Sequence, residues 1–195
     1  VVLLAVVLAL LPLLGALGYW QWGRESSSWF ANYIERRGVW EGVGSVSSLR
    51  QRHRNATYRF VYQKGRLVRV ERRNGLGFLR NDEDGEASWQ FAYDADSGRV
   101  LNILTRDHRG ILQRQLLYND DLSRLEYRDP QGRPKPKKGT DVSLVLRDLD
   151  ERGLITKVRF ANLHEAPRID NEGDHGHLVE RTPLGQDRRV QALRA

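Results

Sequence analysis

The chain begins with an apolar run that constrains its folding more than any other feature. From Val1 to Gly18 there is no charged, amide or hydroxyl side chain, and the first charge is Arg24. A helix rises about 1.5 Å per residue, so about 20 residues cross the roughly 30 Å hydrocarbon core of a bilayer. We therefore expect residues 1–23 to form a transmembrane helix.

Aromatic residues close this run, as they do where membrane-spanning helices meet the lipid headgroups. The residues expected at this interface are Tyr19, Trp20, Trp22, Arg24 and Trp29. Two alternatives stay open, namely an uncleaved secretory signal and a helix buried in a soluble domain. A true span makes the lipid bilayer a partner of the chain and predicts a single-pass membrane protein.

The rest of the chain is strongly polar, since all 57 Lys, Arg, Asp and Glu residues follow Gly23. The net charge is +7, but acidic residues are interspersed almost everywhere. This balance indicates a mixed surface, and we expect no nucleic-acid partner. The chain has no cysteine, which excludes disulfides and thiol chemistry. It also lacks methionine, even at position 1, so we expect a preceding segment, for example a cytoplasmic domain.

Residues 24–57 are expected to join the span to a folded domain. The residues that recur there at helical spacing are Trp29, Phe30, Tyr33 and Ile34. They predict a short amphipathic helix that ends at Gly38. This helix either lies on the membrane surface or packs its aromatic side on the domain that follows. The Gly- and Ser-rich residues 38–49 suit a linker.

From residue 58 the spacing of apolar residues becomes alternating, with turns that end in glycine between the alternating runs. This pattern predicts antiparallel hairpins, because glycine supplies the positive φ of tight turns. We therefore expect a mainly β fold in which residues 58–195 form a meander or a stacked, twisted sheet. The side chains expected in its core are Phe60, Tyr62, Val68, Val70, Trp89, Phe91, Tyr93, Leu101, Ile103, Leu116, Leu144, Leu146, Val158 and Phe160.

An internal repeat marks the last third of the chain. Residues 127–134 (YRDPQGRP) align with residues 160–167 (FANLHEAP) at an offset of 33. The two copies extend over about 127–159 and 160–190. Periods of 20–50 residues are typical of units that stack because each is too small to bury its own apolar face.

The strings YDADSGR (93–99), YRDPQGRP (127–134) and DERG (150–153) resemble the YD-repeat, RHS-like class of bacterial surface proteins. They also resemble short Asp-x-x-Gly-x-Pro repeats of bacterial envelope proteins, and regions that follow the span of membrane-anchored bacterial serine/threonine kinases. The resemblance implies stacked antiparallel hairpins, a location outside the cytoplasm, and binding or scaffold roles.

Few residues suggest chemistry. His175 and His177 lie two apart, as two metal ligands on one strand would, with Asp170 or Asp174 as added oxygen donors; the alternative is a solvated turn. The acidic residues 81–86 lack the ligand spacing of a calcium loop, and we interpret them as an exposed hairpin turn. No phosphate-binding loop, nucleophile elbow or His-Glu-x-x-His motif is present.

These observations favour a membrane-anchored β-repeat module that binds or senses a protein or glycan ligand and has neither a catalytic centre nor a cofactor. Its repeat domain would lie outside the cytoplasm and signal to a cytoplasmic partner. One alternative is an assembly protein that pairs through exposed strand edges. Another is a metal-dependent enzyme built around His175 and His177.

Overall fold

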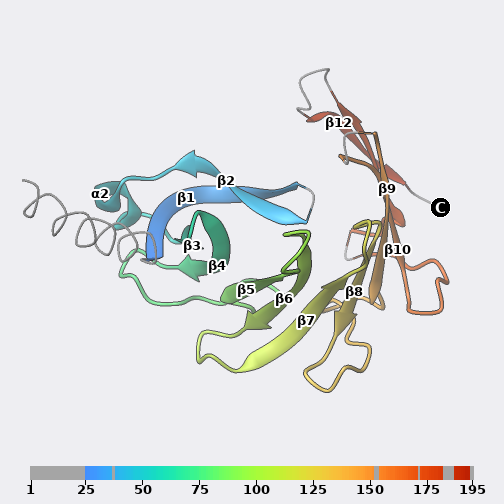
Figure 1. Ribbon diagram of the computed structural model, residues 1–195, viewed down its shortest axis with the longest axis horizontal. Coiled ribbons are helices and arrows are strands. Elements are labelled where there is room, and N and C mark those ends of the chain that lie inside the picture. The colour runs from blue at the N-terminus through green and yellow to red at the C-terminus, as the bar shows by residue number, and fades with distance from the viewer. Residues whose placement is uncertain (1–24, 37, 152–153, 171, 182–186, 194–195) are drawn as a thin grey trace, which may run out of the picture.

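The computed structural model describes residues 25–36, 38–151, 154–170, 172–181 and 187–193, which form one antiparallel sheet (Figure 1). Its strands are β1 (Glu25–Arg36), β2 (Val39–Ser45), β3 (Thr57–Gln63), β4 (Arg66–Arg73), β5 (Ser88–Tyr93), β6 (Val100–Arg106), β7 (Leu112–Tyr118), β8 (Arg124–Arg128), β9 (Leu144–Leu149), β10 (Ile155–Ala161), β11 (Gly176–Arg181) and β12 (Asp187–Leu193). A single helical turn, α2 (Ser48–Gln51), lies between β2 and β3. The predicted mainly β fold is thus confirmed.

The predicted span at residues 1–23 lies outside the described part of the chain, as do Tyr19, Trp20, Trp22 and Arg24. Among the residues that are described, no helix has the length and apolar character needed to cross a bilayer.

The sheet is a meander with one exception at its beginning. Consecutive strands are neighbours from β3 to β12, but the edge order is β3-β1-β2. The first half of β1 pairs with β3, from Glu25 opposite Gln63 to Phe30 opposite Tyr58. Its second half pairs with β2 alone. The far half of the β1–β2 hairpin therefore extends beyond β3.

The predicted amphipathic helix after Arg24 is wrong, because these residues form β1. The predicted linker at 38–49 is wrong as well, since most of it forms β2. The aromatic residues that suggested a helix pack as strand residues do. Phe30 contacts Phe60 edge to face at 5.0 Å, and Tyr33 stacks on Trp40 at 4.1 Å. Pairing of these residues with β3 or β2 overrides the helical spacing.

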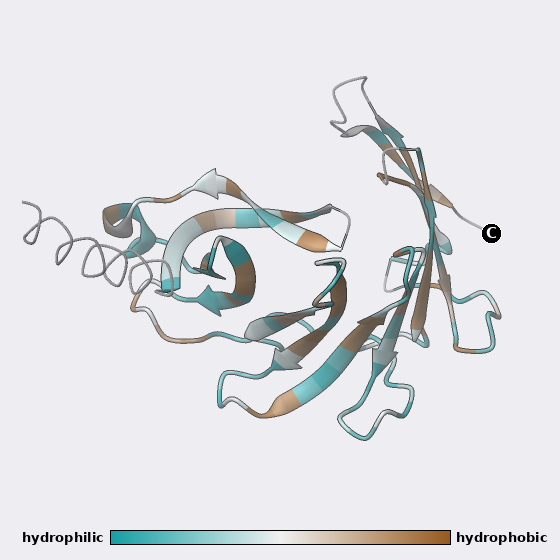
Figure 2. Ribbon diagram, in the orientation of Figure 1, coloured by the Kyte–Doolittle hydropathy of each residue, from teal (hydrophilic) through white to brown (hydrophobic). Residues whose placement is uncertain are grey.

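The sheet curls until the β1–β2 hairpin faces the middle strands across its concave side (Figure 1). Trp40 of β2 packs on two aromatic side chains of β5, with ring centroids 5.2 Å from Trp89 and 5.5 Å from Phe91. At the hairpin turn, a Cβ added to Gly38 would lie 3.3 Å from Leu122, in the β7–β8 turn. Hydrophobic and hydrophilic residues alternate along many of the strands (Figure 2). The apolar side of the strands from β3 to β9 packs in this interior, whereas Leu178 of β11 and Val190 of β12 are exposed.

Half of the predicted core is confirmed as buried. These residues are Phe60, Val70, Trp89, Phe91, Ile103, Leu116 and Leu144. The prediction that Leu101 lies in the core is wrong, since its exposed fraction is 41% and Val100 is buried instead. The strand register explains this exchange, because Ala92 pairs with Asn102 and the next residue, Tyr93, with Val100. This β-bulge leaves Leu101 without a partner and reverses the alternation of faces. A similar bulge buries Leu67 in place of Val68.

One turn type joins many of these strands. An Asp or Asn side chain accepts hydrogen bonds from the backbone N–H groups of the residues two and four positions later. The residue three positions later has a positive φ. Turns that begin at Asn74, Asp107, Asp129, Asn162 and Asp170 have both hydrogen bonds. The left-handed residue is glycine in four of them and Glu165 in the fifth, with φ +59°.

The offset of 33 residues reflects a two-turn loop that occurs three times. In the copies at 72–87, 127–143 and 160–175, a first turn is followed eight residues later by a second. In each copy the same two backbone hydrogen bonds close the loop. In the second copy Lys135 N–H donates to Tyr127 C=O and Tyr127 N–H donates to Ser143 C=O, and in the third copy Arg168, Phe160 and His175 make the equivalent bonds. The residue that enters the next strand is buried in all three, namely Glu86, Val142 and Asp174. The first copy was not predicted from the sequence.

We expect the positive φ of these turns to decide their tolerance to substitution. At Gly110 (φ +84°) an added Cβ would meet no atom within 4 Å, so Gly110→Ala tests backbone strain without a clash. Gly110→Ala should lower the free energy of unfolding by about 1–2 kcal/mol. Gly110→Asn should cost less, because Asn tolerates the left-handed region. Thermal unfolding of the full chain in detergent measures both, and equal losses would contradict this explanation.

Candidate functional site

The curled sheet encloses a polar cavity on its concave side, which we call the inner cavity. It consists of two adjoining hollows of about 520 and 270 Å³. Both hollows are lined by Tyr33, Asp82, Asp84 and Lys137. The larger hollow adds Tyr58, Arg72, Glu83, Lys138 and Gly139, and the smaller one reaches inward past Glu35, Trp40, Glu86, Trp89, Arg114, Tyr118, Tyr127 and Arg147.

Aromatic rings form one wall of the inner cavity. Tyr33 is sandwiched in this wall, stacked on Trp40 and in edge contact with Tyr58 at 5.0 Å. Trp40 in turn packs on Trp89. Burial raises the pKa of Tyr33 well above its usual value of 10.0, so this phenol stays protonated at neutral pH and keeps its O–H as a donor.

A buried ion pair lies on the floor of the cavity. The Glu86 carboxylate accepts hydrogen bonds from Trp89 Nε1 (3.0 Å), Thr105 Oγ1 (2.8 Å) and Arg114 Nε (2.8 Å). The exposed fractions of the Glu86 and Arg114 side chains are 5% and 6%. Burial alone would lower the pKa of Arg114, but the charge and hydrogen bond of Glu86, together with the charge of Asp84, outweigh it and raise that pKa. Arg114 therefore stays charged.

A second buried arginine holds the β1–β2 hairpin against the sheet. Arg147 of β9 donates two hydrogen bonds to Glu35 of β1, from Nη1 to Oε1 at 2.6 Å and from Nη2 to Oε2 at 3.0 Å. Tyr118 of β7 donates to the same carboxylate at 3.3 Å. Glu35 and Arg147 are 112 residues apart in the sequence, so this bidentate pair joins the two ends of the curl.

Each of these arginines also lies over a tyrosine ring. The guanidinium carbon of Arg114 is 5.0 Å from the centroid of Tyr127, and that of Arg147 is 5.4 Å from Tyr118. Burial raises the pKa of Tyr127 to about 12. The interior thus combines aromatic surface with fixed charges, and the arginine charges are satisfied by carboxylates and rings.

The carboxylates near the mouth of the cavity differ from those on the floor. Asp82 belongs to the second turn of the β4–β5 loop, where its Oδ1 accepts from the Glu86 N–H at 2.9 Å. Burial raises the pKa of Asp82 above its usual 3.8, and the negative charges of Glu86 and Asp84 add to this shift. A carboxylate with a raised pKa at the edge of a cavity is common in binding and catalytic sites.

The structure does not gather a metal site around the predicted histidines. Among the described residues, no three His, Asp or Glu side chains are close enough to hold an ion together. His177 Nε2 lies 3.9 Å from Asp170 Oδ2 and its ring contacts Phe160, whereas His175 lines a separate hollow with Leu146 and Phe160. Metal binding at His175 and His177 stays a prediction.

The fifth predicted interface residue, Trp29, is described and lies in β1 opposite Arg59 of β3. It is half-buried. Its contact with lipid headgroups also stays a prediction.

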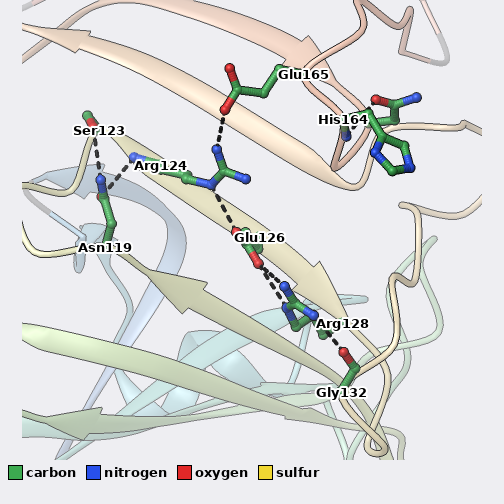
Figure 3. A network of polar contacts seen from close by, with 9 residues as sticks. Asn119, Ser123, Arg124, Glu126, Arg128, Gly132, His164 and Glu165 are labelled. Carbon is green, nitrogen blue, oxygen red and sulfur yellow. Dashed lines mark hydrogen bonds and ion pairs between the residues drawn. The ribbon is translucent and has the colours of Figure 1, made fainter.

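The opposite face of β8 carries a separate charge network (Figure 3). Arg124, Glu126 and Arg128 follow one another along that face, with hydrogen bonds of 2.9 Å and 2.8 Å from the two arginine Nε atoms to Glu126. Arg124 also reaches Glu165 at 2.5 Å. Burial alone would raise the pKa of Glu126, but the two arginines outweigh it and lower that pKa. These partly exposed groups satisfy one another, so we assign the network to the stability of the sheet.

The charged residues of the inner cavity were not predicted from the sequence, in which 81–86 were interpreted as an exposed turn, although Trp89, Leu116 and Phe160 were predicted as core. One sequence feature could have indicated them. Arg114 and Arg147 occupy alternate positions with Leu116 and Val145, so each takes the inward face of its strand. A charged side chain at an inward strand position predicts a buried partner, although the sequence does not say which one.

No protein-family model matches the chain, and no curated protein matches it significantly. The class that the fold defines is therefore a structural one, a single curled antiparallel sheet with repeated two-turn loops.

We expect Asp82→Asn to stabilise the protein at neutral pH. The raised pKa means that the folded state holds the proton more tightly, so ionised Asp82 reduces stability as the pH rises above 3.8. Asn keeps the Oδ1 acceptor, and Asn74 and Asn162 already begin equivalent turns. The melting temperature at pH 7 should rise, and the gain should vanish below pH 3.8.

Asp107→Asn is the matched control for this experiment. Burial alone would raise the pKa of Asp107, but the N–H groups of Ile111 and Arg109 outweigh it and lower that pKa. This substitution should therefore lower the melting temperature at pH 7. A stability loss in both variants would contradict the assignment of Asp82.

Proposed function

We propose that this protein is a binding or sensor module, held at a membrane by residues 1–23, which takes a glycan into the inner cavity and carries out no reaction on it. The observation that carries the proposal is the set of carboxylates at the mouth of an aromatic-walled cavity, among them Asp82, whose pKa is raised by burial. Binding sites commonly combine apolar walls with a few convergent polar groups.

The chemistry of the wall favours a sugar over a purely apolar ligand. Sugar hydroxyls donate hydrogen bonds to carboxylates such as Asp82 and Asp84, and the apolar face of a pyranose ring packs on aromatic rings such as Tyr58. Lys137, across the mouth, offers donors to sugar oxygens. A hollow of about 520 Å³ falls within the usual range for small ligands.

The resemblance to bacterial surface repeats supports a location outside the cytoplasm, where glycans are abundant. Under this proposal the ligand binds between Tyr33 of the β1–β2 hairpin and the carboxylates of the β4–β5 loop. Because β1 follows directly after the predicted span, this contact is a route by which binding would reach a cytoplasmic partner.

Tryptophan fluorescence of the full chain in detergent tests the proposal, since Trp40 and Trp89 line the cavity. Titration with chitotetraose and with cellotetraose should give a saturable change for at least one sugar. Asp82→Asn should weaken this binding by about tenfold, because a hydrogen bond to a charged group is lost. Asp107→Asn, outside the cavity, should bind as the native chain does.

Two outcomes would overturn the glycan proposal. One is the absence of a saturable change with either sugar at millimolar concentration. The other is equal binding by the native chain and Asp82→Asn, which would place the sugar elsewhere.

Assembly through strand edges is the second candidate, and one observation favours it. The sheet does not close on itself, and β2 and β12 form its two ends. Strand edges of this kind pair readily with other chains. A monomeric mass for the detergent-solubilised protein would argue against assembly.

A further inference from the structure

A second surface, away from the inner cavity, combines exposed apolar and basic side chains. We call it the basic–apolar patch, and it consists of Leu49, Arg50, Arg52, Arg54, Leu76, Phe78 and Arg80. The first four lie in α2 and the segment that follows it, and the other three lie in the first turn of the β4–β5 loop.

The two segments of the patch pack against each other. Arg80 Nη1 donates a 3.0 Å hydrogen bond to the carbonyl oxygen of Asn55. Gly75 lies so close that an added Cβ would be 2.5 Å from the carbonyl oxygen of Arg52. Both segments border one shallow hollow on the protein surface. The patch is thus a single surface made by two parts of the chain.

The apolar members of the patch are unusually exposed. The exposed fractions are 83% for Leu76, 73% for Leu49 and 67% for Phe78, the three highest among the large apolar residues that the structure describes as exposed. Each such side chain gains about 1.5–3 kcal/mol when it is removed from water. Three such exposed side chains therefore favour a partner with an apolar layer into which they can insert.

The charge of the patch is of one sign. Residues 47–56 and 74–80 contain four arginines and no Asp or Glu, in a chain where acidic residues otherwise occur almost everywhere. Arginines attract anionic lipid headgroups with about 1 kcal/mol per residue near a membrane surface. Leu and Phe beside them suit the boundary between headgroups and acyl chains.

The position of the patch agrees with such a partner. In Figure 1, α2 and the beginning of β1 lie at the same end of the long axis of the molecule. The predicted span leads directly into β1 at Glu25. A bilayer that holds the span would therefore face the patch, and the strands from β9 to β12 would point away from it.

We propose that the basic–apolar patch lies against an anionic membrane surface. Leu49, Leu76 and Phe78 enter the headgroup layer there, and the arginines contact lipid phosphates. This contact fixes the tilt of the sheet and is separate from ligand binding in the inner cavity. Nucleic acid also attracts arginine, but it offers no apolar layer in which the exposed leucines would be buried.

The absence of cysteine permits a direct test. Leu76→Cys in the full chain is labelled with an environment-sensitive NBD fluorophore and placed in nanodiscs of phosphatidylcholine, with or without phosphatidylglycerol. The emission should shift to the blue with the anionic lipid, and high salt should reduce the shift. Ile169→Cys, also an exposed apolar loop residue, should show no shift.

A second variant separates charge from folding. Replacing Arg50, Arg52 and Arg54 by Gln in the Leu76-labelled chain should abolish the preference for anionic lipid. Sugar binding in the inner cavity should be unchanged, so failure of this proposal and failure of the glycan proposal are distinguishable.

Four results would overturn the membrane contact. They are equal spectra for labels at positions 76 and 169, the same shift without anionic lipid, a shift produced by duplex DNA but not by lipid, and a shift that grows with protein concentration in detergent alone. The third would assign the patch to nucleic acid, and the fourth to a second copy of the chain.

Discussion

The fold depends on one ion pair between the ends of the curl, Glu35 of β1 and Arg147 of β9. An open meander has no reason to bend until its first hairpin meets its ninth strand. The buried guanidinium of Arg147 favours this bend, because the Glu35 carboxylate from across the concave side accepts hydrogen bonds from both of its outer nitrogens. Once the hairpin is held there, Trp40 reaches Trp89 and the inner cavity acquires its aromatic wall.

The same arrangement explains why the cavity is polar. Glu86 and Arg114 pair with each other, and Arg147 pairs with Glu35 through its two outer nitrogens, although its buried Nε has no hydrogen-bond partner; these groups therefore contribute to the structure. Asp82 differs, because burial raises its pKa and its ionised form reduces stability. This contrast directs the proposed glycan to the mouth of the cavity. The basic–apolar patch faces outward instead, so the proposed ligand and the proposed membrane contact use separate surfaces.

The sequence predicted the β class and the offset of 33 residues because both arise from local chemistry, namely alternation of apolar residues and Asx turns with a left-handed glycine. It failed where a distant partner decides. Trp29 to Ile34 have helical spacing, yet pairing with β3 and β2 makes them a strand. Leu101 fits the alternation, yet a bulge turns it outward. The cavity could not be predicted either, since Glu35 and Arg147 have no local reason to meet.

A double-mutant cycle on this pair tests the account most directly. The free energy of unfolding is measured in detergent for the native chain, Glu35→Gln, Arg147→Met and the double variant. If the pair closes the curl, the sum of the two single losses in the free energy of unfolding will exceed the loss in the double variant. The difference, which is the coupling energy, should be about 1–3 kcal/mol. A coupling energy below about 0.5 kcal/mol would mean that the two side chains do not interact, and the curl of the sheet and its inner cavity would be wrong.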